Sequence, residues 1–154
     1  MTMDKRYEIV DVRTYLPIGQ REGGGDPIRT EGHWIVDSLV ANPMSFYPEY
    51  KAKRTSWGIE AFGTFIVQIE TRSGETGIGI SQGGEPACLI VEQHLNRFLL
   101  GADPRDVERI WDQMWRSTLY YGRKGLAIRA ISAVDLALWD LCGKLRGEPV
   151  YRLL

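Results

Sequence analysis

The fold of this chain is decided by its last helical stretch, Ala127-Ile-Arg-Ala-Ile-Ser-Ala-Val-Asp-Leu-Ala-Leu-Trp-Asp-Leu-Cys-Gly-Lys-Leu-Arg146. Its large apolar residues recur at steps of three and four, which predicts an α-helix: Ile131, Val134, Leu138, Leu141 and Leu145. Most of the remaining circumference is also apolar, through Ala133, Leu136, Ala137 and Trp139. Such a helix has to be covered from several sides. It should end near Arg146, because Gly147 can adopt the left-handed capping conformation and Pro149 cannot continue a helix.

Two acidic residues interrupt this helix, Asp135 and Asp140. They are five residues apart, which places them about 140° apart around a helix, so they cannot chelate one metal ion as an i, i+4 pair could. We interpret both as structural acids held by backbone donors or basic side chains. The terminal Leu153 and Leu154 also need a surface to pack against, and we expect a partner for this end of the chain.

The composition is that of an ordinary globular protein, with 154 residues, 44% hydrophobic and 25% charged. This length predicts one domain, or one domain and the beginning of another. A net charge of −1 gives no reason to expect nucleic acid or an anionic membrane as partner. We read Cys88 and Cys142 as buried thiols in a reducing compartment. Without a signal peptide or a long apolar run, we expect a cytoplasmic protein.

Three strands precede the helices. Residues Tyr7 to Leu16 predict the first, with Val10, Val12 and Leu16 on one face and Tyr7, Ile9 and Tyr15 on the other. Phe62 to Thr71 predicts the second, with Phe65, Val67 and Ile69 on one face. A turn at Ser73 to Gly77, in which Gly74 and Gly77 are available for positive φ, leads to a third strand at Ile78 to Ser81. Short connections of this kind predict an antiparallel meander.

Two further helices follow the strands. The first is expected from about Ala87 to Leu99, with Glu92, Gln93 and Asn96 solvated and Gly101 as its cap. The second should begin with Asp103 as N-cap and Pro104 at the first helical position. Its apolar stripe is a core pattern: Val107, Ile110, Trp111, Met114 and Trp115. The fold class is therefore α+β, a three-stranded antiparallel meander followed by a helical layer on one face of the sheet.

The connection from residue 18 to residue 61 is unusually long, and such loops are usually functional or disordered. Its later part is rich in aromatic residues, and it holds the two best candidates for ligand contact, His33 and Arg54. The other histidine, His94, belongs to an apolar helical stripe and is expected to be a hydrogen-bonded structural residue. No phosphate-binding glycine loop, nucleophile motif or cluster of metal ligands is present in the sequence, and Gly77-Ile-Gly79 falls inside a hairpin.

The closing pattern A-x-S-x-V-D-L-A-L-W-D-L-x-G-K-x-x-G-x-P-V-Y-x-L-L, from Ala130 to Leu154, resembles the N-terminal capping domain of the enolase superfamily, in its mandelate racemase-like group. The resemblance extends from Tyr7 to the end of the chain. Within the superfamily, the loop motifs are similar to those of the L-rhamnonate dehydratase family: His33-Trp34-Ile35, Asn42-Pro-Met-Ser45, Arg54-Thr-Ser-Trp-Gly58 and Tyr120-Tyr121.

This resemblance implies that residues 1–154 are a capping domain that ends where a (β/α) barrel domain would begin. In such enzymes the barrel supplies the ligands of Mg²⁺ and the acid and base groups that remove the proton α to a carboxylate. It implies no catalytic residue and no metal ligand in this chain, and it makes His33 and Arg54 the contacts to a sugar-acid substrate. Trp34 and Trp57 would pack around them.

Three expectations follow for the whole protein: loss of water to a 2-keto-3-deoxy acid, the protein's own barrel domain as a partner, and a homo-oligomer. Two alternatives remain open. One is another acid-sugar dehydratase or an epimerase of the same superfamily, and the other is a free-standing, non-catalytic α+β interaction module.

Overall fold

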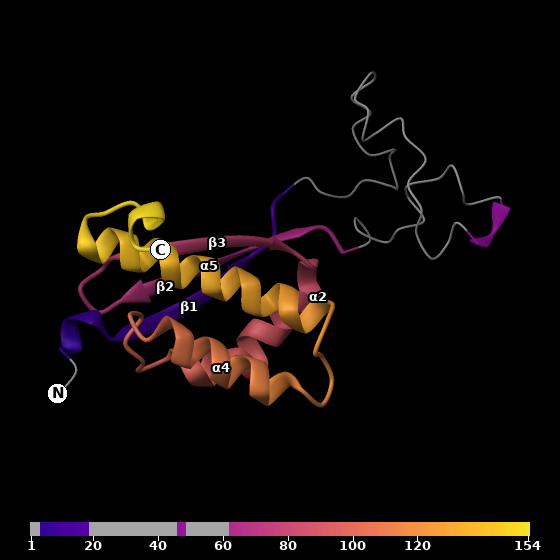
Figure 1. Cartoon of the computed structure of the whole chain (residues 1–154), viewed down its shortest axis with the longest axis horizontal. Helices are drawn as coiled ribbons and strands as arrows, with labels where there is room; N and C mark the ends of the chain where they lie inside the picture. Colours follow the sequence, from indigo (N-terminus) through magenta and orange to yellow (C-terminus); the bar gives the residue numbers. More distant parts are fainter. Residues whose placement is uncertain (1–3, 19–45, 49–61) are drawn as a thin grey trace, which may run out of the picture.

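The computed structural model of this chain describes residues 4–18, 46–48 and 62–154. They contain a three-stranded antiparallel sheet in the order β1-β2-β3, built from β1 (Ile9–Tyr15), β2 (Thr64–Thr71) and β3 (Thr76–Gln82). The helices follow in the order α2 (Gly84–Ile90), a π-helical turn (Val91–Leu95), α3 (Asn96–Leu99), α4 (Val107–Thr118) and α5 (Leu126–Arg146). Figure 1 shows this arrangement, which confirms the predicted α+β class and the meander.

The central strand β2 follows the predicted alternation. Phe65, Val67 and Ile69 are fully buried, and the residues between them are only partly covered. The turn between β2 and β3 has positive φ at Gly74, as predicted. Gly77 is different from the prediction, because it lies within β3 and has no positive φ.

The first strand corrects the predicted assignment of faces. Ile9 pairs with Thr71 and Asp11 pairs with Glu70, so Val10 is an extra residue in a β-bulge. The bulge lets Ile9 and Val12 both enter the core, at 1% and 9% exposure, while Val10 is left 39% exposed. The prediction that Val10 and Val12 share a face was wrong, because simple alternation fails wherever a bulge adds a residue.

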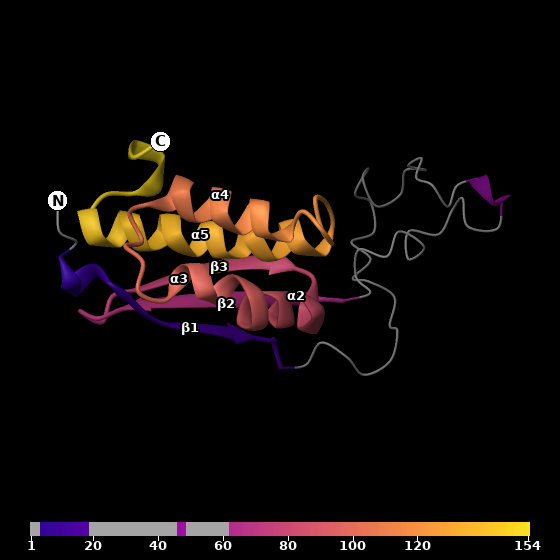
Figure 2. The same cartoon turned by 90° about the horizontal axis from the view of Figure 1, so that it is seen from below.

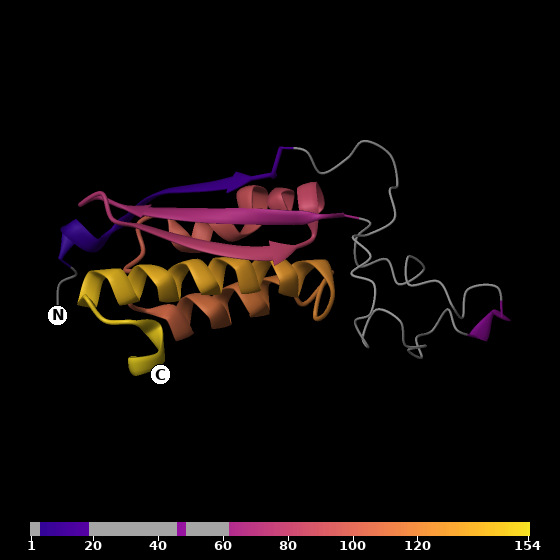
Figure 3. The same cartoon turned by 90° about the horizontal axis from the view of Figure 1, so that it is seen from above.

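Helix α5 packs against β3 at unusually short range. A Cβ atom added to Gly79 would lie 1.9 Å from the carbonyl oxygen of Ala133, and one added to Gly77 would lie 2.1 Å from that of Ala137. Glycine is thus required at both positions because the helix backbone occupies the space of a side chain. Figure 3 shows α5 running alongside β3, with the strands in front of α2. Ten residues of α5 are buried, the first being Ala127 and the last Gly143, which confirms the prediction that this helix is covered from several sides.

The segment after β3 is one nearly continuous helical run, from Gly84 to Leu99, which starts three residues earlier than predicted. Val91 and Leu95 are fully buried under the sheet, while Glu92 and Gln93 are exposed, as predicted. Asn96 is half-buried with its Oδ1 enclosed, so the prediction that it is solvated was wrong.

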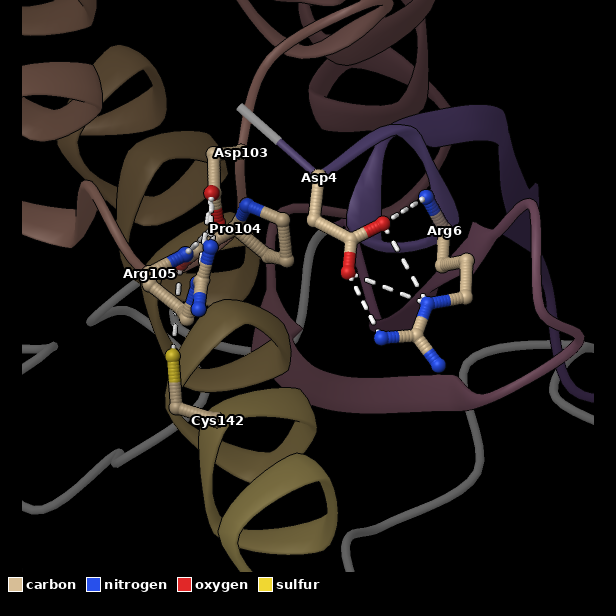
Figure 4. Close-up of polar contacts among 6 residues, drawn as sticks. All are labelled: Asp4, Arg6, Asp103, Pro104, Arg105 and Cys142. Atoms are coloured by element: carbon tan, nitrogen blue, oxygen red, sulfur yellow. Dashed lines mark hydrogen bonds and ion pairs between the residues drawn. The ribbon is translucent and has the colours of Figure 1, made fainter. Parts of the chain in front are cut away.

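The start of α4 is also different from the prediction. The helix begins at Val107, and the preceding residues form a turn in which the Asp103 carboxylate accepts from the backbone N–H and the side chain of Arg105. These bonds from Arg105 lower the pKa of Asp103. Figure 4 shows this turn beside the Asp4–Arg6 pair, with the thiol of Cys142 donating to the carbonyl of Pro104 at 3.3 Å. Asp103 therefore stabilises the turn and does not cap the helix.

The C-terminus of α5 follows the prediction. Gly147 adopts the left-handed conformation with φ 66°, and a short 3₁₀ helix, Val150–Arg152, follows Pro149. Leu153 is half-buried against the core, whereas Leu154 is 84% exposed. Figure 2 shows that this tail turns back from the end of α5, on the same side of the molecule as α4.

Replacing Gly79 by alanine tests the close approach of α5 and β3. The added methyl group collides with the Ala133 carbonyl. We therefore expect the free energy of unfolding to fall by at least about 3 kcal/mol, which lowers Tm by about 6 °C or more. Thermal unfolding followed by circular dichroism measures the change. Ile80→Ala on the exposed face of the same strand is the control and should cost less than about 1 kcal/mol. Equal losses for the two variants would contradict the packing described here.

Candidate functional site

The candidate site lies at one end of the sheet, where the chain leaves β1 and returns to β2. Tyr15 at the end of β1 is paired with Ile66, and Thr64 at the start of β2 is paired with Gln82. We call this region the loop end. The predicted site residues His33 and Arg54, together with Trp34 and Trp57, belong to the segment that connects β1 to β2. All four lie outside the described residues.

A glycine turn anchors the chain where it returns to the sheet. The backbone N–H groups of Gly83 and Gly84 both donate to the carbonyl of Gly63, at 2.9 and 3.1 Å. Gly84 has φ +51°, and a Cβ atom there would lie 1.7 Å from the carbonyl oxygen of Phe62. The turn therefore fixes the position of Phe62 and Gly63, directly after the segment that holds Arg54.

Our sequence analysis did not identify this turn as part of a site. The available signal was the Gly83-Gly84 pair just before Pro86, since two adjacent glycines at a strand end mark an unusual backbone conformation.

The loop between α4 and α5, residues 119–125, lies at the same end of the molecule (Figure 1). Tyr121 in this loop is hydrogen-bonded to Nδ1 of His94 at 2.6 Å. Burial, and secondarily the charge of Arg97, lowers the pKa of His94. The prediction of a hydrogen-bonded structural histidine is confirmed, and the pair ties the loop to the helical run below the sheet.

Positive charge is available at the loop end. Arg123, Lys124 and Arg129 are exposed there, and Nη1 of Arg129 donates to Oε1 of Gln82 at 3.3 Å. Glu85 is the exposed acid that follows the glycine turn. Guanidinium and ammonium groups donate several hydrogen bonds to carboxylates. Exposed Glu92, which is hydrogen-bonded to Thr14 near the end of β1, adds a second acid to this region, so the described part of the loop end carries charges of both signs.

The two acids of α5 have different environments. Asp140 accepts from the backbone N–H of Ile78 at 2.8 Å and from Lys144 at 2.6 Å, which confirms its structural role. Asp135 is half-buried, and none of the described residues donates to it, so the same prediction was wrong for Asp135. Burial alone raises its pKa.

The remaining chemistry of the described residues is limited. Cys88 and Cys142 are buried free thiols, as predicted, and burial raises the pKa of both. Within residues 4–18, 46–48 and 62–154, no group of three His, Cys, Asp or Glu side chains could hold a metal ion. No helix in these same ranges is long and apolar enough to cross a membrane.

A short antiparallel meander, a helical layer on one face and a long connection at one sheet end define the N-terminal capping domains of the enolase superfamily. The chain belongs to the mandelate racemase / muconate lactonizing enzyme N-terminal domain family, whose model matches residues 51–154.

Its relatives include L-rhamnonate dehydratases. The chain is 57% identical over 134 residues to the L-rhamnonate dehydratase of Saccharopolyspora erythraea, a match that covers 86% of this chain and 34% of that protein. The crystal structure of L-rhamnonate dehydratase from Gibberella zeae superposes with a TM-score of 0.80 at 44% identity, covering 99% of this chain and 36% of that one. A second structure of the Gibberella zeae enzyme, complexed with Mg, gives a TM-score of 0.81. The chain thus spans about a third of the length of these relatives.

Other solved structures match a smaller part of the chain. A racemase from Streptomyces coelicolor with bound magnesium is 45% identical but covers 52% of this chain and 24% of that one, with a TM-score of 0.51.

Gly84→Ala tests the anchor of the loop end. The substitution combines a positive φ with a collision against the Phe62 carbonyl, and we expect it to cost clearly more than the roughly 1–2 kcal/mol of an ordinary left-handed alanine. Gly74→Ala is the matched control, because Gly74 also has positive φ but no atom lies within 4 Å of its added Cβ. Comparing the urea denaturation midpoints of the two variants separates the cost of the collision from the cost of the positive φ. A Gly84→Ala midpoint as high as that of Gly74→Ala would show that this turn does not clamp residues 62 and 63.

Proposed function

We propose that this chain caps the active site of an acid-sugar dehydratase, with L-rhamnonate as the substrate. The observation that carries the proposal is the match to L-rhamnonate dehydratases, which extends over nearly the whole chain at 44% identity with the same fold. The match to the magnesium-bound racemase covers only about half of the chain. A match that covers nearly the whole chain supports a common substrate. Membership of the superfamily alone would not.

The proposed reaction divides its tasks between two domains. A base in the barrel domain removes the proton α to the substrate carboxylate, and loss of the 3-hydroxyl as water gives a 2-keto-3-deoxy acid. Magnesium, held by the barrel, would supply Lewis-acid stabilisation of the negative charge that develops on the carboxylate. The described residues contribute no metal-binding cluster to this scheme.

This chain would bind and orient the substrate from the side of the active site that the cap covers. Arg54 has a planar guanidinium that can donate in parallel to two oxygens of a carboxylate or of neighbouring hydroxyls. His33 would donate to a substrate hydroxyl. The glycine turn at Gly83 and Gly84 would hold the returning end of the loop at a fixed distance from the sheet. Exposed cations at the loop end, such as Arg123 and Lys124, would attract the anionic substrate.

We further propose a cytoplasmic homo-oligomer. Free buried thiols at Cys88 and Cys142 suit a reducing compartment. The outer face of the sheet exposes Ile78 and Ile80, at 47% and 55%, and apolar side chains of this kind suit contact with another copy. Light scattering of the complete protein measures its mass, and a monomer would contradict the second part of this proposal.

Arg54 provides the direct kinetic test. In the complete enzyme, Arg54→Ala should remove charge-assisted hydrogen bonds worth roughly 1.5–3 kcal/mol each and so reduce kcat/KM for L-rhamnonate by about ten- to a hundredfold or more. Arg54→Lys should recover only part of the loss, because lysine keeps the charge without the planar fork. His33→Asn should cost less if histidine only donates to a hydroxyl.

Arg116→Ala is the control for these kinetics, since Arg116 is an exposed residue of α4 paired with Asp112. Thermal melts of each variant exclude loss of folding as the cause. Unchanged kinetics for both Arg54→Ala and His33→Asn would refute the proposed substrate contacts. A panel of other acid sugars tests the choice of substrate, because a higher kcat/KM on another member would replace L-rhamnonate.

A further inference from the structure

The loop between α4 and α5 carries two adjacent tyrosines with opposite surroundings. The hydroxyl of Tyr121 is bound to Nδ1 of His94 at 2.6 Å, and the two rings have centroids 5.6 Å apart. Tyr120 is fully exposed, at 102%, so no described residue covers its ring. An aromatic side chain buries a large apolar area when it meets a partner. Tyr120 is therefore the side chain of this loop that is available to a group from outside the domain.

The backbone beside Tyr120 is held in place. The N–H groups of Tyr121 and Gly122 both donate to the carbonyl of Thr118, at 3.1 and 2.8 Å. Thr118 is fully buried, and its hydroxyl donates to the carbonyl of Trp115 at 3.0 Å. The exposed ring is thus attached to a turn that buried groups fix. A side chain presented in this way loses little backbone freedom when a ligand binds, which favours recognition.

The start of α5 connects this loop to the glycine turn of the candidate site. A Cβ atom added to Gly83 would lie 3.3 Å from Cδ2 of Leu126, so the first residue of α5 packs on that turn. A Cβ atom added to Gly122 would lie 2.2 Å from Cβ of Ala127, so the loop packs on the next residue of α5. The loop between α4 and α5 therefore lies beside the turn at which the chain returns to β2 (Figure 1).

The proposed substrate has two ends of opposite character. L-Rhamnonate is an open-chain acid sugar with a carboxylate at C1, hydroxyl groups from C2 to C5 and a methyl group at C6. Arg54 and His33, in the roles proposed above, address the carboxylate and the hydroxyl groups. The methyl group requires a different partner, because an apolar group gains free energy from contact with an apolar surface. The ring of a tyrosine provides such a surface.

We propose that the ring of Tyr120 contacts the C6 methyl group of the substrate, which makes Tyr120 a specificity-determining residue of this enzyme. This inference rests on the proposed function, which supplies an acid sugar with an apolar end. A methyl contact made equally in the bound substrate and in the transition state lowers KM and leaves kcat unchanged. It also selects against an acid sugar with a hydroxyl at C6, because that hydroxyl would lose water against the ring without gaining a hydrogen bond.

Steady-state kinetics on two substrates test this contact in the complete enzyme. L-Mannonate is the comparison substrate, because it has the configuration of L-rhamnonate and carries a hydroxyl group on C6. We expect Tyr120→Ala to reduce kcat/KM for L-rhamnonate by about tenfold, mainly through KM, and to change kcat/KM for L-mannonate by less than about threefold. Tyr120→Phe keeps the ring and should keep the wild-type ratio of the two values.

Two controls separate a substrate contact from a change in folding or assembly. Leu100→Ala removes an exposed apolar side chain at the opposite end of the domain, where Gly101 and Ala102 pair with Ile9 at the start of β1. It should leave the ratio unchanged. Thermal melts and light scattering should give Tyr120→Ala the Tm and the mass of the wild type, because its ring is fully exposed in this domain.

The outcomes separate this inference from the proposed function. Wild-type turnover of L-rhamnonate with a ratio that Tyr120→Ala leaves unchanged would overturn the methyl contact and retain the proposed function. A loss for Tyr120→Phe as large as that for Tyr120→Ala would assign the contact to the hydroxyl and overturn the proposal. A smaller mass for Tyr120→Ala, with equal losses on both substrates, would assign the ring to an interface between copies and also overturn it. A wild-type enzyme that does not turn over L-rhamnonate would refute the proposed function, and the methyl contact with it.

Discussion

The close approach between the backbone of α5 and strand β3 is the constraint on which the rest of this domain depends. Two strand glycines, Gly77 and Gly79, leave room for the carbonyl groups of Ala137 and Ala133. Small residues on both sides bring the helix axis near the strand, so that Val134, Leu138 and Leu141 reach the core. Because interiors are packed without large voids, the position of α5 then determines where α4 and the helical run after β3 can lie.

The packing of α5 against β3 also positions the loop end. Helix α5 begins at Leu126, next to the place where β3 ends, and Arg129 in its first turn reaches Gln82. The glycine turn after Gln82 then holds Gly63 at the start of β2. A long connection is therefore attached at both of its ends to parts of the domain that packing makes rigid. Binding loops on a rigid scaffold are a common arrangement in enzymes.

Much of this fold could be predicted from the sequence, because long periodic patterns carry most of the information. The alternation in β2 and the nearly complete apolar circumference of α5 led directly to the observed core. The errors fall where local chemistry competes with the pattern. A bulge at Val10 moves Ile9 into the core, and Asp103 binds Arg105 where a helix cap was expected.

The candidate site could be predicted only in part. His33 and Arg54 were singled out by their place in the long connection, and their proposed role as substrate contacts came from resemblance to a family, since a single histidine or arginine in a loop has no distinguishing periodicity. The anchoring role of Gly84 depends on its distance to Phe62, a contact between residues 22 positions apart that no local pattern encodes. The lack of a donor for Asp135 likewise depends on which neighbours surround α5.

Hydrogen exchange in the complete two-domain protein tests the central claim, that this chain closes over an acid sugar through the segment between β1 and β2. Exchange of the peptides that contain His33 and Arg54 is measured with Mg²⁺ alone and with Mg²⁺ plus L-rhamnonate. The proposed function predicts that the substrate slows exchange in these peptides and leaves β2 unchanged. Equal exchange in both conditions, at a substrate concentration that saturates turnover, would contradict the assignment of this chain as the substrate-binding cap.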